Sequence, residues 1–153
     1  MEIVFKKGEL EDVATLVEFM EEYYEYDHLE FNRKAAEKAL EELLSDESMG
    51  FVWLIDCDGT EVGYIVLSFI CSLEFHGRAG FIDEMYIREG YRKRGIGLKA
   101  LEFVVEFCRG NRIDALRLEV ERSNERAQSI YKKFGFTSHD RFIMTRWINP
   151  KDV

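Results

Sequence analysis

The sequence contains few of the residues that build disulfide frameworks and metal centres. Of its 153 residues, three are cysteine and three are histidine. Cys57, Cys71 and Cys108 are odd in number and form no C-x-x-C pair, and no H-x-x-x-H spacing occurs. Neither a disulfide scaffold nor a zinc site is therefore indicated. We expect no metal, reduced thiols, and core positions for Cys71 and Cys108.

A long uncharged run is also missing. Charged residues make up 33% of the chain, and no stretch approaches the roughly 20 apolar residues that an α-helix needs to span a bilayer. The first residues, Met1 to Lys7, lack the basic start, apolar run and cleavage site of an export signal. We therefore expect a cytoplasmic protein that has no membrane partner.

Repeats, low-complexity segments and linkers are absent from the sequence as well. Hydrophobic residues make up 46% of the chain and aromatic residues 14%, which argues against disorder and allows a sizeable core. Because nothing divides the sequence, we expect a single domain over residues 1–153.

Basic side chains are scarce in the first third of the chain. Residues 1–50 hold 15 acidic and 5 basic side chains, whereas residues 88–133 hold 7 acidic and 12 basic ones. The net charge of −9 disfavours nucleic acid, which needs a large basic face. A small phosphorylated ligand suits the basic segment better, although solvated helix faces give the same distribution.

Hydrophobic periodicity and turn signals predict the order β-αα-βββ-α-β-α-β, an α/β (α+β) fold. Asp58-Gly59 is a hairpin signal, so the strands on either side of it are expected to be antiparallel. The expected strands are 3–5, 51–56, 61–69, 79–87, 115–120 and 142–148, and the expected helices are 9–24, 33–44, 95–109 and 124–134.

The segment Arg92-Lys93-Arg94-Gly95-Ile96-Gly97 lies between a predicted strand and a predicted helix. Glycine lets the backbone come close to a ligand, and the first amides of a helix are unpaired donors at the positive end of its dipole. The pattern therefore predicts a phosphate-binding loop. The alternative is a helix start whose glycines serve only to turn the chain.

The same residues also match a dinucleotide fingerprint, Gly95-x-Gly97-x-x-Ala100, with Glu119 about 20 residues later. Against this, seven residues separate Ile87 from Gly95, whereas the dinucleotide turn follows its strand directly. A small dinucleotide-binding protein is therefore the less favoured interpretation.

A second pattern, Asn124-x-x-Ala127-x-x-x-Tyr131-x-x-x-Gly135-Phe136, falls on the last predicted helix. Its first three positions share one helical face. A phenol near the end of that face can donate a proton. The alternative is an amphipathic tyrosine at the edge of a core.

Taken together, the two patterns and the order of elements resemble the GNAT superfamily of acetyl-CoA-dependent N-acetyltransferases. The resemblance covers nearly the whole chain and is most specific between Ile82 and Phe136. It implies a mixed, mostly antiparallel sheet flanked by helices, direct transfer of an acetyl group from acetyl-CoA to a primary amine, and a possible homodimer. A non-catalytic acyl-CoA-binding regulatory module is the alternative.

The resemblance also implies where the cofactor binds. Backbone groups of Met85, Tyr86 and Ile87 would meet the pantetheine arm, Asn124 would contact the cofactor, and Tyr131 would protonate the departing CoA thiolate. The pyrophosphate would be held by the amides of Arg92, Lys93, Arg94, Gly95, Ile96, Gly97 and Leu98.

An alkylamine with a pKa near 10 is mostly protonated at pH 7, so a base or a water chain must remove its proton before attack. Asp83 and Glu84 are the candidates. Because neighbouring strand residues face opposite sides, only one of them is expected to point into the site, and Glu84 is our first choice. The alternative for either acid is a strand-end residue that faces solvent or pairs with Arg78 or Arg88.

Substrate recognition in the resembled superfamily belongs to the first two helices and their connection. Here that region is rich in carboxylates and aromatic rings, which suit a cationic amine such as a polyamine, an aminoglycoside-like compound or a basic peptide. The alternative is that these carboxylates form the solvated side of a helix. The expected substrate-binding residues are Glu25, Tyr26, Asp27, His28 and Glu84.

Overall fold

A computed structural model of the chain describes residues 1–149, which form two compact units that meet in sequence at Leu118 and Glu119. The elements of the first unit are β1 (Ile3–Lys7), α1 (Val13–Tyr26), α2 (Arg33–Ser45), β2 (Gly50–Cys57), β3 (Thr60–Ser72), β4 (Gly77–Ile87), α3 (Ile96–Gly110) and β5 (Leu116–Leu118). The second unit contains α4 (Glu125–Lys133). None of the helices in the described part of the chain has the length and apolar character needed to cross a membrane.

The five strands form one mixed sheet in the order β1-β2-β3-β4-β5. The first three pairings are antiparallel and the β4–β5 pairing is parallel, which confirms the predicted sheet. The predicted hairpin joins β2 to β3, with Asp58 and Gly59 both at positive φ (52° and 87°), as a tight two-residue hairpin turn requires.

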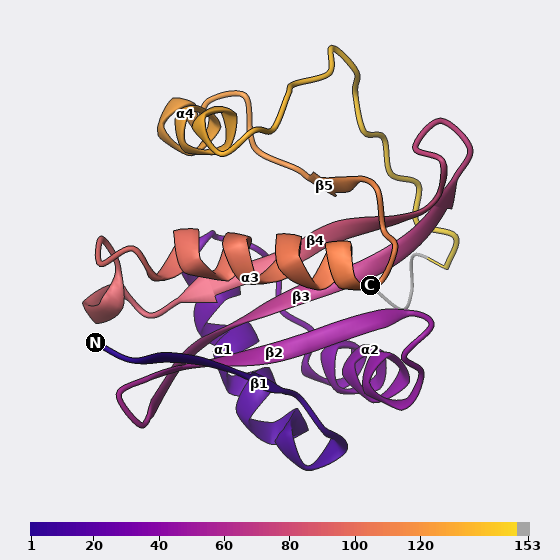
Figure 1. Ribbon diagram of the computed structural model, residues 1–153. Coiled ribbons are helices and arrows are strands. Elements are labelled where there is room, and N and C mark those ends of the chain that lie inside the picture. The colour runs from indigo at the N-terminus through magenta and orange to yellow at the C-terminus, as the bar shows by residue number, and fades with distance from the viewer. Residues whose placement is uncertain (150–153) are drawn as a thin grey trace. The chain divides into compact units, whose positions relative to one another are not determined.

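Alternate residues of β2 pack against different helices. Val52 and Leu54 belong to a core cluster with residues of α1 and α2, whereas the ring of Trp53 lies 5.1 Å from that of Phe103 and 4.9 Å from that of Phe107, both on α3. The two helix layers therefore cover opposite faces of the sheet (Figure 1). Burial on both faces explains why the strand is a continuous apolar run.

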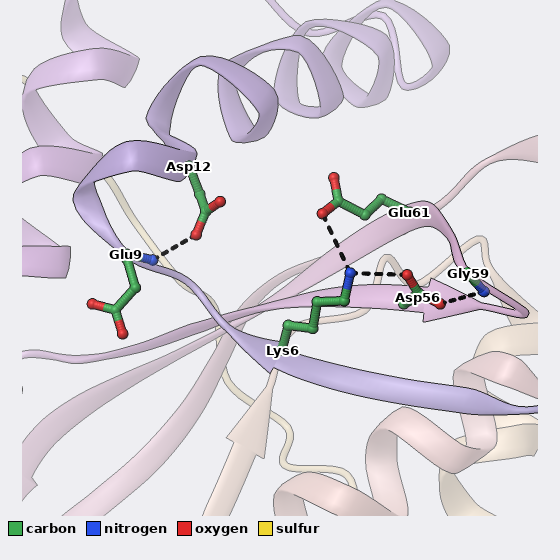
Figure 2. Close-up of polar contacts among 6 residues, drawn as sticks. All are labelled: Lys6, Glu9, Asp12, Asp56, Gly59 and Glu61. Atoms are coloured by element: carbon green, nitrogen blue, oxygen red, sulfur yellow. Dashed lines mark hydrogen bonds and ion pairs between the residues drawn. The ribbon is translucent and has the colours of Figure 1, made fainter.

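A buried carboxylate fastens the β2–β3 hairpin to β1 (Figure 2). Asp56 is only 5% exposed; it accepts a hydrogen bond from the Gly59 amide at 2.7 Å and pairs with Lys6 at 2.9 Å. The hydrogen bond from Lys6 holds the pKa of Asp56 below its usual value. The charge of Asp56 is thus compensated within the sheet.

The predicted last strand is wrong. Residues 142–148 form no strand, and Phe142 and Met144 are 84% and 90% exposed. Apolar, β-branched and aromatic residues favour an extended chain, but a strand exists only where a neighbour pairs its backbone groups. No strand in the described residues pairs with this segment.

The expected core position of one cysteine is also wrong. Cys57 and Cys108 are buried, and burial raises the pKa of the Cys108 thiol to about 11. Cys71 is exposed, because it pairs with Arg78 close to the end of the β3–β4 hairpin. All three cysteines are free thiols.

Candidate active site

A β-bulge in β4 places the two candidate bases. Along β3, Val66 faces Glu84 while the next residue, Leu67, faces Ile82, so Asp83 is an extra residue in the strand. Bulges break strict alternation and redirect side chains. The expectation that only one of the two acids can face the site rested on alternation, and alternation does not hold at this point of the strand.

Glu84 is fixed by two phenols. Tyr24 of α1 donates a hydrogen bond to its Oε2, and Tyr64 of β3 donates to its Oε1 at 2.7 Å. Burial raises the pKa of Glu84; the two hydrogen bonds oppose this rise and the charge of Asp83 adds to it. Both carboxylate oxygens of Glu84 thus have a protein donor.

Asp83 has no such partners. It forms no hydrogen bond or ion pair with the residues that the structure describes. Its side chain is exposed, yet the protein around it removes enough water to raise its pKa above the usual aspartate value. A carboxylate with a raised pKa and free lone pairs is suited to accept a proton near neutral pH.

One edge of β4 has no partner strand from Asp83 onward. β5 pairs with Gly80, Phe81 and Ile82 and then ends. Within the first unit, no strand pairs with this edge of residues 83–87, while their other edge pairs with β3. The unpaired backbone groups on this open edge can therefore serve a ligand, although the Ile87 carbonyl already accepts a hydrogen bond from Arg92 Nε. A pantetheine arm along Met85, Tyr86 and Ile87 stays a prediction.

The predicted phosphate-binding loop presents a row of free amides. None of the amides from Lys93 to Leu98 donates to a backbone acceptor in the described part of the chain, because they precede or begin α3. Gly95 takes a left-handed φ of 80°, and at Gly97 an added Cβ would meet only ordinary contacts, 3.7 Å and more away. Gly97 is therefore not required by the fold, and this cradle fits a pyrophosphate.

The three basic side chains of the loop differ in their surroundings. Arg92 donates through Nε to the Ile87 carbonyl at 2.7 Å, and its own amide donates to the Glu89 carbonyl. Arg94 lies over the Tyr91 ring, 5.2 Å from its centroid, and Lys93 is exposed with φ 61°. Lys93 and Arg94 thus leave their amides free for a ligand, whereas the Arg92 amide already has an acceptor. Leu98, in the first turn of α3, is also exposed.

The expected substrate-binding residues form the end of α1 and the turn after it. Glu25, Tyr26, Asp27 and His28 are all exposed, and His28 adopts a left-handed φ of 56°. The turn is closed by backbone hydrogen bonds, including one from the Leu29 amide to the Tyr24 carbonyl at 2.8 Å. Because Tyr24 also contacts Glu84, this turn and the candidate bases of β4 both lie beside the C-terminal end of α1.

The second unit carries the two remaining predicted site residues. The side chain of Asn124 caps α4 by accepting from the Ala127 amide at 3.1 Å. Burial raises the pKa of Tyr131, whose ring lies 5.8 Å from that of Phe136. A phenol with a raised pKa stays protonated at neutral pH, as a proton donor must.

Residues 1–149 bring together no group of three or more His, Cys, Asp or Glu side chains that is able to hold a metal ion. The site as described therefore consists of an acidic pair at a strand bulge, an open strand edge and a helix start with free amides.

The model of the acetyltransferase (GNAT) family matches residues 13–136. The chain belongs to this family. A thialysine N-epsilon-acetyltransferase from Bos taurus is 27% identical over 142 residues, which cover 87% of this chain and 83% of the relative. The protein is thus an acyltransferase enzyme, an N-acetyltransferase that uses acetyl-CoA as its donor.

Solved structures share the fold of this acetyltransferase. An integron cassette protein from the mobile metagenome of Cole Harbour salt marsh is 30% identical with a TM-score of 0.83, over 95% of this chain and 91% of that one. A predicted acetyltransferase from Clostridium acetobutylicum, solved with acetyl-CoA, is 20% identical with a TM-score of 0.80, over 95% and 96%. The family assignment decides against the dinucleotide-binding and non-catalytic alternatives.

Two residues of the site were missed by the sequence analysis. Neither Tyr24 nor Tyr64 is among the site residues that the sequence predicts. A signal for Tyr64 exists in the sequence, because a tyrosine inside an aliphatic strand must find a partner for its hydroxyl when buried. Its partner is Glu84.

Proposed function

We propose that this acetyltransferase acts on the primary amine of a small cationic acceptor, such as a polyamine or an aminoglycoside-like compound, or of a basic peptide. The observation that carries the proposal is the acidic pair at the β4 bulge. Neither Asp83 nor Glu84 is neutralised by a cation among the described residues, and the exposed Glu25 and Asp27 extend the negative charge along the turn after α1. Such a surface attracts an ammonium group.

The name of the Bos taurus relative supports a small amine acceptor. Thialysine N-epsilon-acetyltransferase denotes an enzyme that acts on the side-chain amine of an amino acid. The relative is 27% identical to this chain over most of both sequences, so we propose an acceptor of the same chemical class, an amine at the end of a flexible alkyl chain.

We propose that Asp83 accepts the proton of the incoming ammonium group and that Glu84 lies beside it as the second acid. The sequence placed Glu84 first, but its two oxygens already accept from Tyr24 and Tyr64. Asp83 has its lone pairs free and a raised pKa, which brings its basicity closer to neutral pH. A water chain that ends at Asp83 would serve the same purpose.

The donor site in this proposal consists mostly of main-chain groups. The amides of Lys93 to Leu98 and the side chain of Asn124 would hold the cofactor, with Met85 to Ile87 along its arm. Acetyl-CoA supplies a thioester whose carbonyl a neutral amine can attack. Tyr131 would give its phenolic proton to the departing sulfur, since its raised pKa keeps it protonated.

We also propose that residues 1–153 act as one N-acetyltransferase domain, because the family match runs through both units. A cytoplasmic location is supported by three free cysteines.

A homodimer is supported by the exposed apolar side chains Phe142, Ile143, Met144, Trp147 and Ile148. Sedimentation velocity on the full chain tests the dimer, and a single monomeric species at micromolar concentration would contradict it.

An acceptor screen tests the proposed function. Purified enzyme with acetyl-CoA is offered spermidine, thialysine, kanamycin, a lysine-rich peptide and, as the acidic comparison, glutamate, and released CoA is measured. We expect turnover on cationic amines and a raised KM in the Asp27→Asn variant, with Asp46→Asn at the far end of α2 as the matched control. Turnover on glutamate at the rate of the cationic amines would overturn the proposal.

A further inference from the structure

The side chain of Arg92 leaves the loop that it begins and lies against the end of α1. Its guanidinium carbon is 4.1 Å from the ring centroid of Tyr26, the last residue of α1, and 5.5 Å from that of Tyr86. Its Nε is held by the Ile87 carbonyl at 2.7 Å. Arg92 thus contacts the end of β4 and the end of α1 at once.

We propose that Arg92 is a positioning residue that links the cofactor loop to the turn after α1, so that CoA binding at the loop orders the acceptor-binding turn. This inference rests on the proposed assignment of the loop to the cofactor and of the turn to the acceptor. Lys93, the first residue of the loop whose amide is free, follows Arg92 directly in the chain. A ligand that fixes this amide therefore also fixes the backbone from which the Arg92 side chain extends.

The receiving end of the link is an exposed turn that backbone hydrogen bonds close. Tyr26 is 57% exposed, and the turn after it is closed by amide donors at Asp27, His28 and Leu29, with donor–acceptor distances of 3.0, 3.2 and 2.8 Å. The positive φ of His28 adds strain for a residue that has a Cβ. Opening of this turn breaks these hydrogen bonds, and a contact that persists longer when the loop is occupied would hold it closed.

Of the two arginines near the end of β4, only Arg92 has no carboxylate partner among the described residues. Arg88, four residues earlier, forms a bidentate ion pair with Glu22 of α1. Arg92 forms no ion pair with any carboxylate of the described residues, so its contacts with α1 are those with the aromatic ring. Removing the Tyr26 ring therefore breaks the link without leaving a buried charge unpaired.

Hydrogen exchange with and without CoA tests the link. We expect CoA to slow exchange of the amides of residues 93–98 and, by about fivefold, those of residues 27–29 in the unaltered protein. In the Tyr26→Leu variant the slowing at 93–98 is expected to remain and the slowing at 27–29 to disappear. The matched control is Tyr91→Leu, which removes the ring under Arg94 and is expected to leave both effects in place.

Each result bears on the inference. No effect of CoA at 27–29 in the unaltered protein, or an undiminished effect in Tyr26→Leu, would overturn the link while leaving the acetyltransferase assignment and the cofactor loop intact. Absence of slowing at 93–98 in every variant would instead show that the loop is not the CoA site, and both proposals would fall together.

Discussion

Arg88 binds Glu22 through both carboxylate oxygens, with Nε 3.0 Å from Oε2 and Nη2 2.7 Å from Oε1. Tyr86 adds a hydrogen bond to the same carboxylate at 3.2 Å, and the guanidinium carbon lies 4.6 Å from the ring centroid of Phe19. The pair fastens α1 to the end of the strand that carries the acidic pair. A bidentate geometry of this kind is the form of ion pair that contributes most to stability at a surface.

We predict that Glu22→Gln lowers the free energy of unfolding at pH 7 by about 1 kcal/mol or less, because both side chains are more than a third exposed and solvent screens the pair. The hydrogen bond from Arg88 lowers the pKa of Glu22. Its stabilising effect is therefore complete above the ordinary glutamate pKa and is lost as the pH falls through the lowered value. Urea unfolding of both proteins at pH 7 and at pH 3 measures this.

The control for this variant is Glu21→Gln. Glu21, which precedes Glu22 on α1, pairs with Arg33 of α2, and both side chains are half exposed. We expect a smaller loss of stability than for Glu22→Gln. Equal losses, or a loss that does not shrink at acid pH, would contradict the importance given to the Arg88 pair.

Asp83→Asn is predicted to lower kcat/KM by about 100-fold, the lower end of what a general base contributes. As the proposed base, Asp83 must be deprotonated to accept a proton, so the rate of the unaltered enzyme is expected to rise with pH through the raised pKa of this residue. In the variant this acid limb is expected to vanish. Initial rates between pH 5 and pH 9 with saturating acetyl-CoA give both profiles.

Glu84→Gln is predicted to slow the reaction less than Asp83→Asn. It is also predicted to be more stable than the parent protein, by a difference that grows as the pH rises. Burial raises the pKa of Glu84, so its charged form is disfavoured in the folded state and costs stability above that pKa. Glutamine removes this cost and still offers an acceptor to Tyr64. Melting temperatures at pH 5 and pH 8 test this; a difference between variant and parent that does not grow with pH would count against it.

Gly97→Ala is predicted to leave the fold intact and to weaken CoA binding by about tenfold or more. The added Cβ meets Ile87 and Met85 only at 3.7 and 3.9 Å, and alanine is the better helix residue by up to about 1 kcal/mol. The methyl group instead occupies space that a closely bound pyrophosphate needs. Gly97→Asp, which adds negative charge, is expected to abolish binding.

Calorimetric titration of the Gly97 variants with CoA, together with their melting temperatures, makes this measurement. Gly90→Ala is the control, since an added Cβ there meets nothing within 4 Å and the residue lies ahead of the free amides. Unchanged affinity in Gly97→Ala would remove the amides near Gly97 from the proposed cofactor site.

Tyr131→Phe is predicted to lower kcat by about 100-fold with little change in CoA affinity, because only the phenolic proton is lost. Burial raises the pKa of Tyr131, so the unaltered enzyme is expected to keep its activity to the alkaline end of the stable range. Tyr91→Phe is the control for loss of a hydroxyl. A Tyr131→Phe enzyme with normal kcat would exclude Tyr131 as the general acid.

Most of the first unit was predictable because its signals are local. The Asn32 cap, whose side chain accepts from the Ala35 amide at 3.1 Å, and the Asp58-Gly59 turn depend on residues close to each other in the chain. The apolar stripes of α1 and α2 are equally local. Such elements follow from propensity and periodicity alone.

The features that escaped prediction depend on a distant partner. The bulge at Asp83 exists only in the register between β4 and β3, and Tyr64 reaches Glu84 across that pairing. Residues 142–148 have a strand-forming composition but no strand that pairs with them in the described sheet. The Arg92 side chain contacts the ring of Tyr26, 66 positions earlier in the sequence.

The proposed donor site consists mostly of amides and a strand edge, and these backbone groups are the same whatever the side chains are. Selection on such a site constrains backbone shape and a few glycines, so sequences can diverge to 27% or 30% identity around one fold. The proposed acceptor site depends instead on side chains, those at the end of α1 and the acidic pair of β4. New acceptors can therefore evolve, or be engineered, by exchanging the residues around Tyr26 while the donor half is inherited unchanged.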